Sequence, residues 1–135
     1  MIFGVGTDIV EVARIEATFE RFGGHFVERL LMPQERALFE RSKWPVRFLA
    51  MRFAGKEAAV KALGTGFRHG MWLRDVGIVN NERGRPLVVF SERGEALRRQ
   101  LGAGPAHVSL TDDAGLVAAF AVILNAGAAP SMEPF

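Results

Sequence analysis

The first third of the chain alternates between a strand-like and a helix-like spacing of apolar residues. Residues 1–10 are largely apolar and predict a first strand, in which Gly4 and Gly6 would allow another part of the backbone to come close. From Glu11, apolar residues recur at steps of three and four, which predicts an amphipathic helix broken near residues 23–24. The chain therefore starts with a strand that leads directly into a helix.

The middle of the chain contains the strongest helical pattern. Pro33 fits the first turn of a short helix that runs to about residue 41. Residues 46–63 are apolar around most of a helix, and Gly64 is a natural residue to end it. A connector at 65–72 follows, which we expect to be flexible, and then a hairpin over residues 76–90 that turns at 80–84.

The last third predicts a short helix from Ser91 to about residue 101 and two further strands, 107–111 and 116–124. The second of these strands is almost wholly apolar, which is typical of a central position in a sheet. This order of elements favours an α+β fold, in one domain over residues 1–125, with an antiparallel sheet packed against the long helix. The small, unpatterned tail 126–135 is expected to be disordered.

Composition narrows the class of protein only a little. The chain has 135 residues, 49% of them hydrophobic, so it can bury a core without disulfides. It has no cysteine, no secretory leader pattern and no run long enough to span a membrane, which together predict a cytoplasmic protein without membrane contact. A net charge of +2 is weak evidence for nucleic-acid binding, and we expect none. Arg outnumbers Lys, which suits phosphate recognition but equally reflects a plain preference for Arg.

Two glycine-rich segments resemble nucleotide-binding loops only superficially. After Gly4 and Gly6, a dinucleotide-binding fingerprint would need a third glycine, and the chain has Ile9 there. A phosphate-binding loop around Lys56 would need Ser or Thr as its next residue, and that residue is Glu57. Both interpretations are therefore discarded.

Charged residues on the long helix are better candidates. Glu57 and Lys61 lie one turn apart on one face, and Arg52 lies on a second stripe of this mostly apolar helix. Buried charges need a partner or a ligand, although an ordinary salt bridge would satisfy Glu57 and Lys61 equally well. Asp8, at the end of the first strand, is either a turn residue or a second carboxylate beside Glu57. Such a pair could hold Mg²⁺, with Lys61 and Arg52 neutralising phosphate oxygens.

A third group of polar residues alternates along the strand predicted at 107–111. His107, Ser109 and Thr111 should project from one face of that strand. A hydrolytic triad with Asp112 or Asp113 is disfavoured, because side chains two apart on a strand are poorly placed for the hydrogen bond between nucleophile and base. His107 alone could equally be a half-buried structural histidine.

Three segments together resemble the holo-acyl-carrier-protein synthase family, the short phosphopantetheinyl transferases. They are GVGTDIV at 4–10, RFAGKEAAVKALG at 52–64 and HVSLTD at 107–112, in the order and at the spacing of the family. The resemblance covers residues 1–124 and excludes the tail. It implies transfer of the 4′-phosphopantetheine arm of coenzyme A to a serine of apo-acyl carrier protein, in fatty acid or polyketide biosynthesis. The other product would be adenosine 3′,5′-bisphosphate.

The resemblance also implies roles for individual residues. Asp8 and Glu57 would hold Mg²⁺, and Glu57 would assist removal of the serine proton, directly or through a metal-bound water. Lys61 would balance charge on the bridging and leaving oxygens. The implied nucleotide contacts are Arg52, His107, Ser109 and Thr111, with Gly64 and Gly66 as a backbone wall against the adenosine.

The resemblance further implies a homotrimer with its sites between subunits, and an acidic carrier protein as partner. Arg14 and Arg21, on the outer face of the first helix, are the expected docking residues, although they could also belong to an ordinary solvated face. Two alternatives remain open at this point. One is an oligomeric module that binds coenzyme A without catalysis, and the other is an α+β interaction protein with no affinity for nucleotides.

Overall fold

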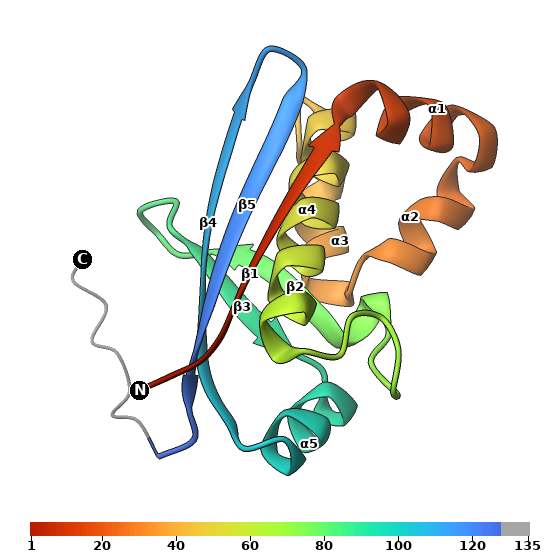
Figure 1. Ribbon diagram of the computed structural model, residues 1–135. Helices are drawn as coiled ribbons and strands as arrows, with labels where there is room; N and C mark the ends of the chain where they lie inside the picture. Colours follow the sequence, from red (N-terminus) through yellow and green to blue (C-terminus); the bar gives the residue numbers. More distant parts are fainter. Residues whose placement is uncertain (128–135) are drawn as a thin grey trace.

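The computed structural model describes residues 1–127, and the tail predicted to be disordered lies almost wholly outside them. The larger sheet has three strands. Figure 1 shows one long helix lying across this sheet, with smaller helices on the far side of that helix. The elements in chain order are β1 (Ile2–Glu11), α1 (Val12–Phe22), α2 (Gly24–Leu30), α3 (Pro33–Glu40), α4 (Pro45–Leu63), a 3₁₀ turn η1 (Leu73–Asp75), β2 (Val76–Asn80), β3 (Pro86–Phe90), α5 (Glu92–Gln100), β4 (Ala103–Asp113) and β5 (Leu116–Asn125). The α+β class is confirmed.

The strands are all antiparallel and form two sheets. The larger sheet has the order β1-β5-β4, and the hairpin of β2 and β3 forms a second sheet. β5 is the central strand, as its apolar sequence predicts. β4 extends beyond the predicted strand 107–111 at both ends. Within it, His107 pairs with Val122 of β5, Ser109 with Phe120, and Thr111 with Ala118. These three polar residues therefore share one face of the sheet, the face turned away from α4.

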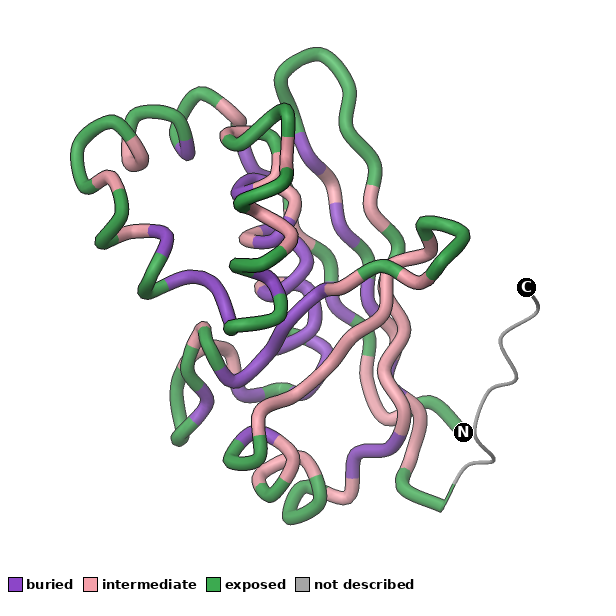
Figure 2. The backbone as a smooth tube through the Cα atoms, turned by 180° about the vertical axis from the view of Figure 1, so that it is seen from behind, coloured by how far each residue is buried: buried purple, intermediate pink, exposed green. Residues whose placement is uncertain are grey.

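Helix α4 is the core of the molecule. Its apolar residues are buried against the inner face of the large sheet, where Val117, Ala119, Ala121 and Ile123 of β5 also lie. Figure 2 shows the buried stretches gathered where α4 meets the strands. A helix that is apolar around most of its circumference is covered on most sides, as expected.

Gly4 and Gly6 place β1 directly against α4. A Cβ atom at Gly4 would overlap the carbonyl oxygen of Ala62, and one at Gly6 would overlap that of Ala58. No larger residue fits at either position without moving backbone. The close approach that these glycines predicted is therefore between the first strand and the long helix.

The amphipathic segment after β1 is divided into two helices. α1 ends at Phe22, Gly23 adopts a φ of 54°, and α2 begins at Gly24. A positive φ suits glycine and turns the chain, so the break predicted near residues 23–24 is confirmed. The two helices bring Ile15, Val27 and Leu30 into the same core as α4.

A buried ion pair joins the helices to the hairpin. Lys56 of α4 and Glu35 of α3 are both fully buried, with Nζ 2.6 Å from Oε1. The ammonium also donates to the carbonyl oxygens of Leu30, Leu73 and Val76. Glu35 accepts from the backbone N–H groups of Met32 and Ile78. Each charge is thus surrounded by hydrogen bonds, as a buried pair requires.

Candidate functional site

Asp8 and Lys61 meet at the open edge of β1. Asp8 points to the α4 side of the sheet, and its Oδ1 lies 3.1 Å from Nζ of Lys61, which also donates to the carbonyl oxygen of Thr7 at 3.0 Å. Gly6 makes this approach possible, because a Cβ there would meet the Cβ of Lys61. The other oxygen of Asp8, Oδ2, is buried and accepts no hydrogen bond from any residue between 1 and 127.

Glu57 lies beside Asp8 and Lys61, and these three residues are called the acidic cluster below. It lies one turn before Lys61 on α4, and it lines a hollow of about 320 Å³ together with Asp8, Arg14, Phe26 and Phe53. Burial raises the pKa of Glu57, the nearby charge of Asp8 raises it further, and Lys61 acts in the opposite direction. Among the described residues Lys61 forms its ion pair with Asp8 and none with Glu57. The alternative of an ordinary salt bridge between Glu57 and Lys61 is therefore not found in the described part of the chain.

This donor set fits a magnesium ion. One buried carboxylate oxygen lacks a partner, and a second, half-buried carboxylate lies beside it in the same hollow. Within the described part of the chain, no cluster of three or more His, Cys, Asp or Glu residues could hold a metal alone. Mg²⁺ characteristically takes only one or two protein carboxylates and completes its octahedron with phosphate oxygens and waters. Two carboxylates in one hollow match that preference.

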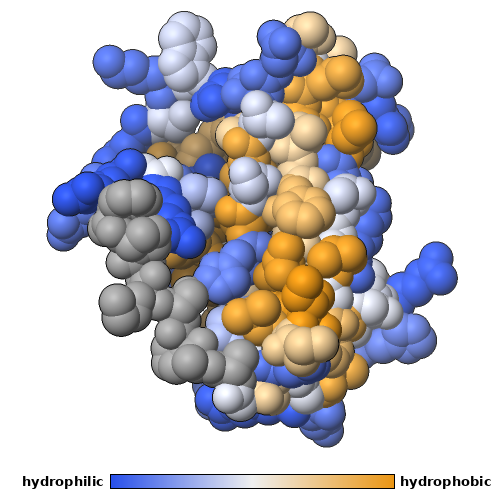
Figure 3. Space-filling view, turned by 60° about the vertical axis from the view of Figure 1, so that its left-hand side comes forward, coloured by the Kyte–Doolittle hydropathy of each residue, from blue (hydrophilic) through white to orange (hydrophobic). Residues whose placement is uncertain are grey.

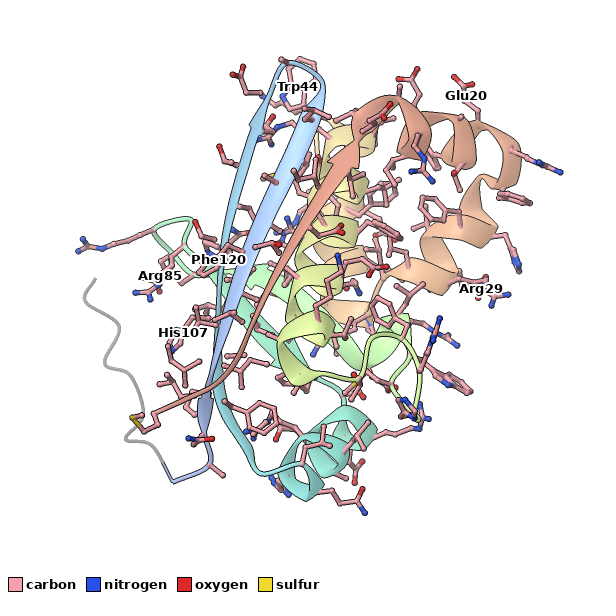
Figure 4. The ribbon with its side chains drawn as sticks, viewed as in Figure 1. Glu20, Arg29, Trp44, Arg85, His107 and Phe120 are labelled. Carbon is pink, nitrogen blue, oxygen red and sulfur yellow. The ribbon has the colours of Figure 1, made fainter. Side chains whose placement is uncertain are left out.

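The polar residues of β4 divide between two hollows. Ser109 and Thr111 line a hollow of about 650 Å³ on the outer sheet face, and Asp8 and Lys61 lie at its β1 end. His107 is on the same face but lines another hollow, beside Arg85 and Pro86 (Figure 4). The structure therefore places Ser109 and Thr111 in one hollow with Asp8 and Lys61, although their side chains lie on the opposite face of the sheet from the Asp8 carboxylate, and it leaves His107 apart.

Arg52 faces a different side of α4 from Glu57. The two are roughly 140° apart around the helix, because five residues at about 100° each separate them. Arg52 donates to Oδ1 of Asn80 at 2.8 Å, stacks over Phe48 with its Cζ 4.0 Å from the ring centroid, and has a buried Nε that no described residue accepts from. Burial lowers the pKa of this guanidinium. Arg52 and Glu57 therefore line different hollows of the chain.

The sequence did not reveal Asn80 as a partner of Arg52. Asn80 ends β2, where an asparagine is ordinarily assigned to the turn, and its amide does donate to the carbonyl oxygen of Gly84. Its contact with Arg52 spans 28 positions in the chain, so no local spacing could have indicated it. Only the packing of the hairpin against α4 brings the two together.

The remaining predicted residues lie at the surface. Gly64 and Gly66 have φ values of 84° and 57°, and nothing lies within 4 Å of a Cβ built at either position, so both present open backbone after α4. Arg14 lines the hollow of Asp8 and Glu57, whereas Arg21 is exposed two turns further along α1, with its guanidinium over Phe22. The two arginines therefore lie at different distances from the cluster.

Comparisons with known proteins show the family of the chain. The chain is 40% identical over 122 residues to a holo-[acyl-carrier-protein] synthase of Hamiltonella defensa, across 90% of this chain and 97% of that one. Its fold matches the crystal structure of a holo-[acyl-carrier-protein] synthase from Neisseria meningitidis with a TM-score of 0.87 and 37% identity, over 91% of this chain and 98% of that one.

A second solved structure was determined with a ligand. The Helicobacter pylori holo-[acyl-carrier-protein] synthase in complex with coenzyme A matches with a TM-score of 0.77 and 32% identity, over 88% of this chain and 98% of that one. The family model of the 4′-phosphopantetheinyl transferase superfamily covers residues 4–121, which include every residue of the acidic cluster. This chain belongs to the 4′-phosphopantetheinyl transferase superfamily.

Proposed function

We propose that this chain is a holo-acyl-carrier-protein synthase, which transfers 4′-phosphopantetheine from coenzyme A to a serine of apo-acyl carrier protein. The observation that carries the proposal is the pair of carboxylates in one hollow: Asp8 with an unpartnered buried oxygen, and Glu57 with a raised pKa. Two relatives named holo-[acyl-carrier-protein] synthase support the proposal, since this chain aligns with 97% and 89% of their length. The products are holo-acyl carrier protein and adenosine 3′,5′-bisphosphate.

In the reaction, the serine Oγ attacks the β-phosphorus of coenzyme A, and the bond from that phosphorus to the bridging oxygen breaks. Asp8 and Glu57 would hold Mg²⁺, which when bound supplies positive charge to the diphosphate oxygens. Glu57 would also accept the serine proton, a role that the raised pKa of its carboxyl in the metal-free chain supports. Lys61, held by Asp8 and Thr7, neutralises the charge that develops on the leaving oxygen.

The other predicted substrate contacts are proposed to bind the nucleotide part of coenzyme A. Ser109 and Thr111 lie in the hollow that begins at Lys61. Arg52 and His107 lie in separate hollows of the same chain, so we propose that a neighbouring subunit presents them to this site. Gly64 and Gly66 would form the open backbone wall next to the adenosine.

An exposed apolar sheet face supports this arrangement. Ile9 is 70% exposed and Phe120 is 45% exposed on the face away from α4, and Ile2, Val5 and Leu116 are exposed there as well. Figure 3 shows a band of apolar side chains on one face of the molecule. An exposed apolar band of this kind on β1 and β5, beside the polar residues of β4, is typical of an interface. We propose that copies of the chain cover it in a homotrimer.

Arg14 is proposed as the inner docking contact for the carrier protein and Arg21 as the outer one. Arg14 lines the hollow of Glu57, where the carrier's serine must arrive, and Arg21 lies two turns further from it.

A cytoplasmic location remains a prediction, and so does a place in fatty acid or polyketide biosynthesis. No helix within residues 1–127 has the length and hydropathy needed to cross a membrane.

The test is a mass measurement on the carrier protein. Incubation of the chain with apo-acyl carrier protein, coenzyme A and Mg²⁺ should add one phosphopantetheine to the carrier, and Glu57→Gln should remove the activity while retaining the circular dichroism of the fold. An unmodified carrier, beside a control synthase that is active, would contradict the proposal. Coenzyme A binding without conversion would instead indicate the non-catalytic module.

A further inference from the structure

Lys56, one half of the buried ion pair with Glu35, is the residue directly before Glu57 in α4. The side chains of Lys56 and Glu57 therefore leave the helix about 100° apart. Glu57 faces the hollow of Asp8, whereas Lys56 and Glu35 are both fully buried where α4 meets α3 and the hairpin. Neither charged group of the pair can touch a substrate, and the proposed reaction does not use them.

The ammonium of Lys56 has acceptors in four separate segments of the chain. Its Nζ lies 2.6 Å from Oε1 of Glu35 in α3. It also donates to three backbone carbonyl oxygens: that of Leu30 at the end of α2 at 2.6 Å, that of Leu73 in η1 at 3.0 Å and that of Val76 in β2 at 2.7 Å. Hydrogen bonds from an ionised donor are shorter and stronger than those between neutral groups. One side chain of α4 is thus held in a defined direction by α2, α3, η1 and β2.

The apolar packing of α4 around this point constrains the direction of the helix less closely. Between residues 54 and 62, every position other than Lys56, Glu57 and Lys61 is Ala, Gly or Val. Small side chains interdigitate less than large ones, so they resist rotation of a helix about its axis only weakly. The ion pair of Lys61 with Asp8 acts on the β1 side, but the Lys61 side chain is 49% exposed. The buried ammonium of Lys56 is therefore the stronger constraint on the rotation of α4.

We propose that the pair of Glu35 and Lys56 fixes the rotation of α4 and thereby places the Glu57 carboxylate beside Asp8. Both members are positioning residues, and this role rests on the proposed function of Glu57. Stability alone does not account for the pair, because apolar residues of similar volume often replace a buried ion pair without loss of stability. Position has a larger effect, since a misplacement of about 1 Å in an active site can lower a rate roughly 100-fold.

Glu35→Leu with Lys56→Met removes both charges while keeping similar side-chain volumes. The urea midpoint of this double variant should stay close to that of the wild-type chain. Its kcat for phosphopantetheine transfer should fall about tenfold or more, with a much smaller change in the KM for coenzyme A. A crystal structure of the double variant should show the Glu57 carboxylate displaced relative to Asp8. A merely structural pair would affect the urea midpoint and leave kcat unchanged, so these measurements separate the two roles.

Two further variants complete the test. Ile123 is fully buried in β5, and Ile123→Val removes one methylene group from the core without changing a charge. This control should lower the urea midpoint and leave kcat within about twofold of the wild-type value. Glu35→Asp keeps the ion pair but shortens the carboxylate arm by one methylene group, so it should lower kcat in a chain that folds.

Four outcomes are decisive. A wild-type kcat in a folded double variant would overturn the proposal, and so would a lower kcat with Glu57 in its original place. An equal loss of kcat in Ile123→Val would also overturn it, because stability rather than position would then be responsible. If the double variant does not fold, Glu35→Asp decides, and a wild-type kcat there would overturn the proposal. An inactive wild-type chain would instead contradict the proposed function, and the position of Glu57 in the double variant would still test this inference.

Discussion

Among single residues, Glu57 has the environment that most affects its chemistry. Its raised pKa follows from burial first and from the charge of Asp8 second, and only Lys61 opposes them. The folded chain therefore holds the Glu57 proton to higher pH than the unfolded chain does. Because the folded state binds more protons across that window, its free energy of unfolding must fall as pH rises through it.

We expect Glu57→Gln to remove this fall. Without metal, the wild-type chain should lose stability as pH rises from the ordinary range of a glutamate to the raised pKa of Glu57, and the variant should lose less over the same window. Urea unfolding in the presence of a chelator, at a series of pH values, measures the difference. Parallel pH profiles for the two chains would show that Glu57 does not carry a raised pKa.

Glu57 must be ionised both to hold Mg²⁺ and to accept a proton. At limiting Mg²⁺, the activity of the wild-type chain should therefore decline as pH falls through the raised pKa that Glu57 has in the metal-free chain. Saturating Mg²⁺ favours the ionised carboxylate, so it should move the decline to lower pH. Profiles of activity against pH at several Mg²⁺ concentrations measure this, and a decline that does not depend on Mg²⁺ would point to a different group.

At the scale of elements, the contact between β1 and α4 depends on glycine. Gly6→Ala would drive a methyl group into the backbone of Ala58 and Ala62, and neither helix nor strand can yield locally. Overpacking of this kind typically costs about 1–3 kcal/mol, and backbone collisions lie at the upper end. The same shift would move Asp8 and Lys61, so activity should fall together with stability.

Gly24→Ala is the matched control. Gly24 begins α2 with nothing within 4 Å of a built Cβ, so alanine there should leave stability unchanged or raise it by up to about 1 kcal/mol. Urea midpoints for the two variants give the comparison. If Gly6→Ala were no less stable than Gly24→Ala, the close packing of β1 on α4 would be wrong.

At the scale of the whole molecule, the exposed sheet face controls assembly. Phe120→Asp places a charge in the middle of the apolar band while leaving the α4 side of β5 untouched. The chain should then become monomeric. It should also lose transfer activity, because Arg52 and His107 would no longer reach the site of a neighbour and because Phe120 lines the hollow of Ser109 and Thr111. Light scattering after gel filtration measures the mass. A variant that remains trimeric, or a monomer with full activity, would contradict the proposed assembly.

The sequence by itself determined the elements, the central position of β5 and the three residues of the acidic cluster. These follow from local periodicity, from glycine placement and from motif order, all of which can be seen along the chain. The polar face of β4 could be predicted for the same reason, since alternation along a strand determines which side chains share a face.

The tertiary structure alone decided which charges are partners. Spacing along α4 suggested that Lys61 pairs with Glu57. Because β1 packs closely against α4, Lys61 instead forms its ion pair with Asp8. Glu57 has a raised pKa. Lys56, next to Glu57 in sequence, is fully buried with Glu35, and Arg52 is bonded to Asn80. These partners are 21 to 53 positions apart. A local sequence pattern cannot indicate partners this far apart in the chain, because helices and strands bring them together only when they pack.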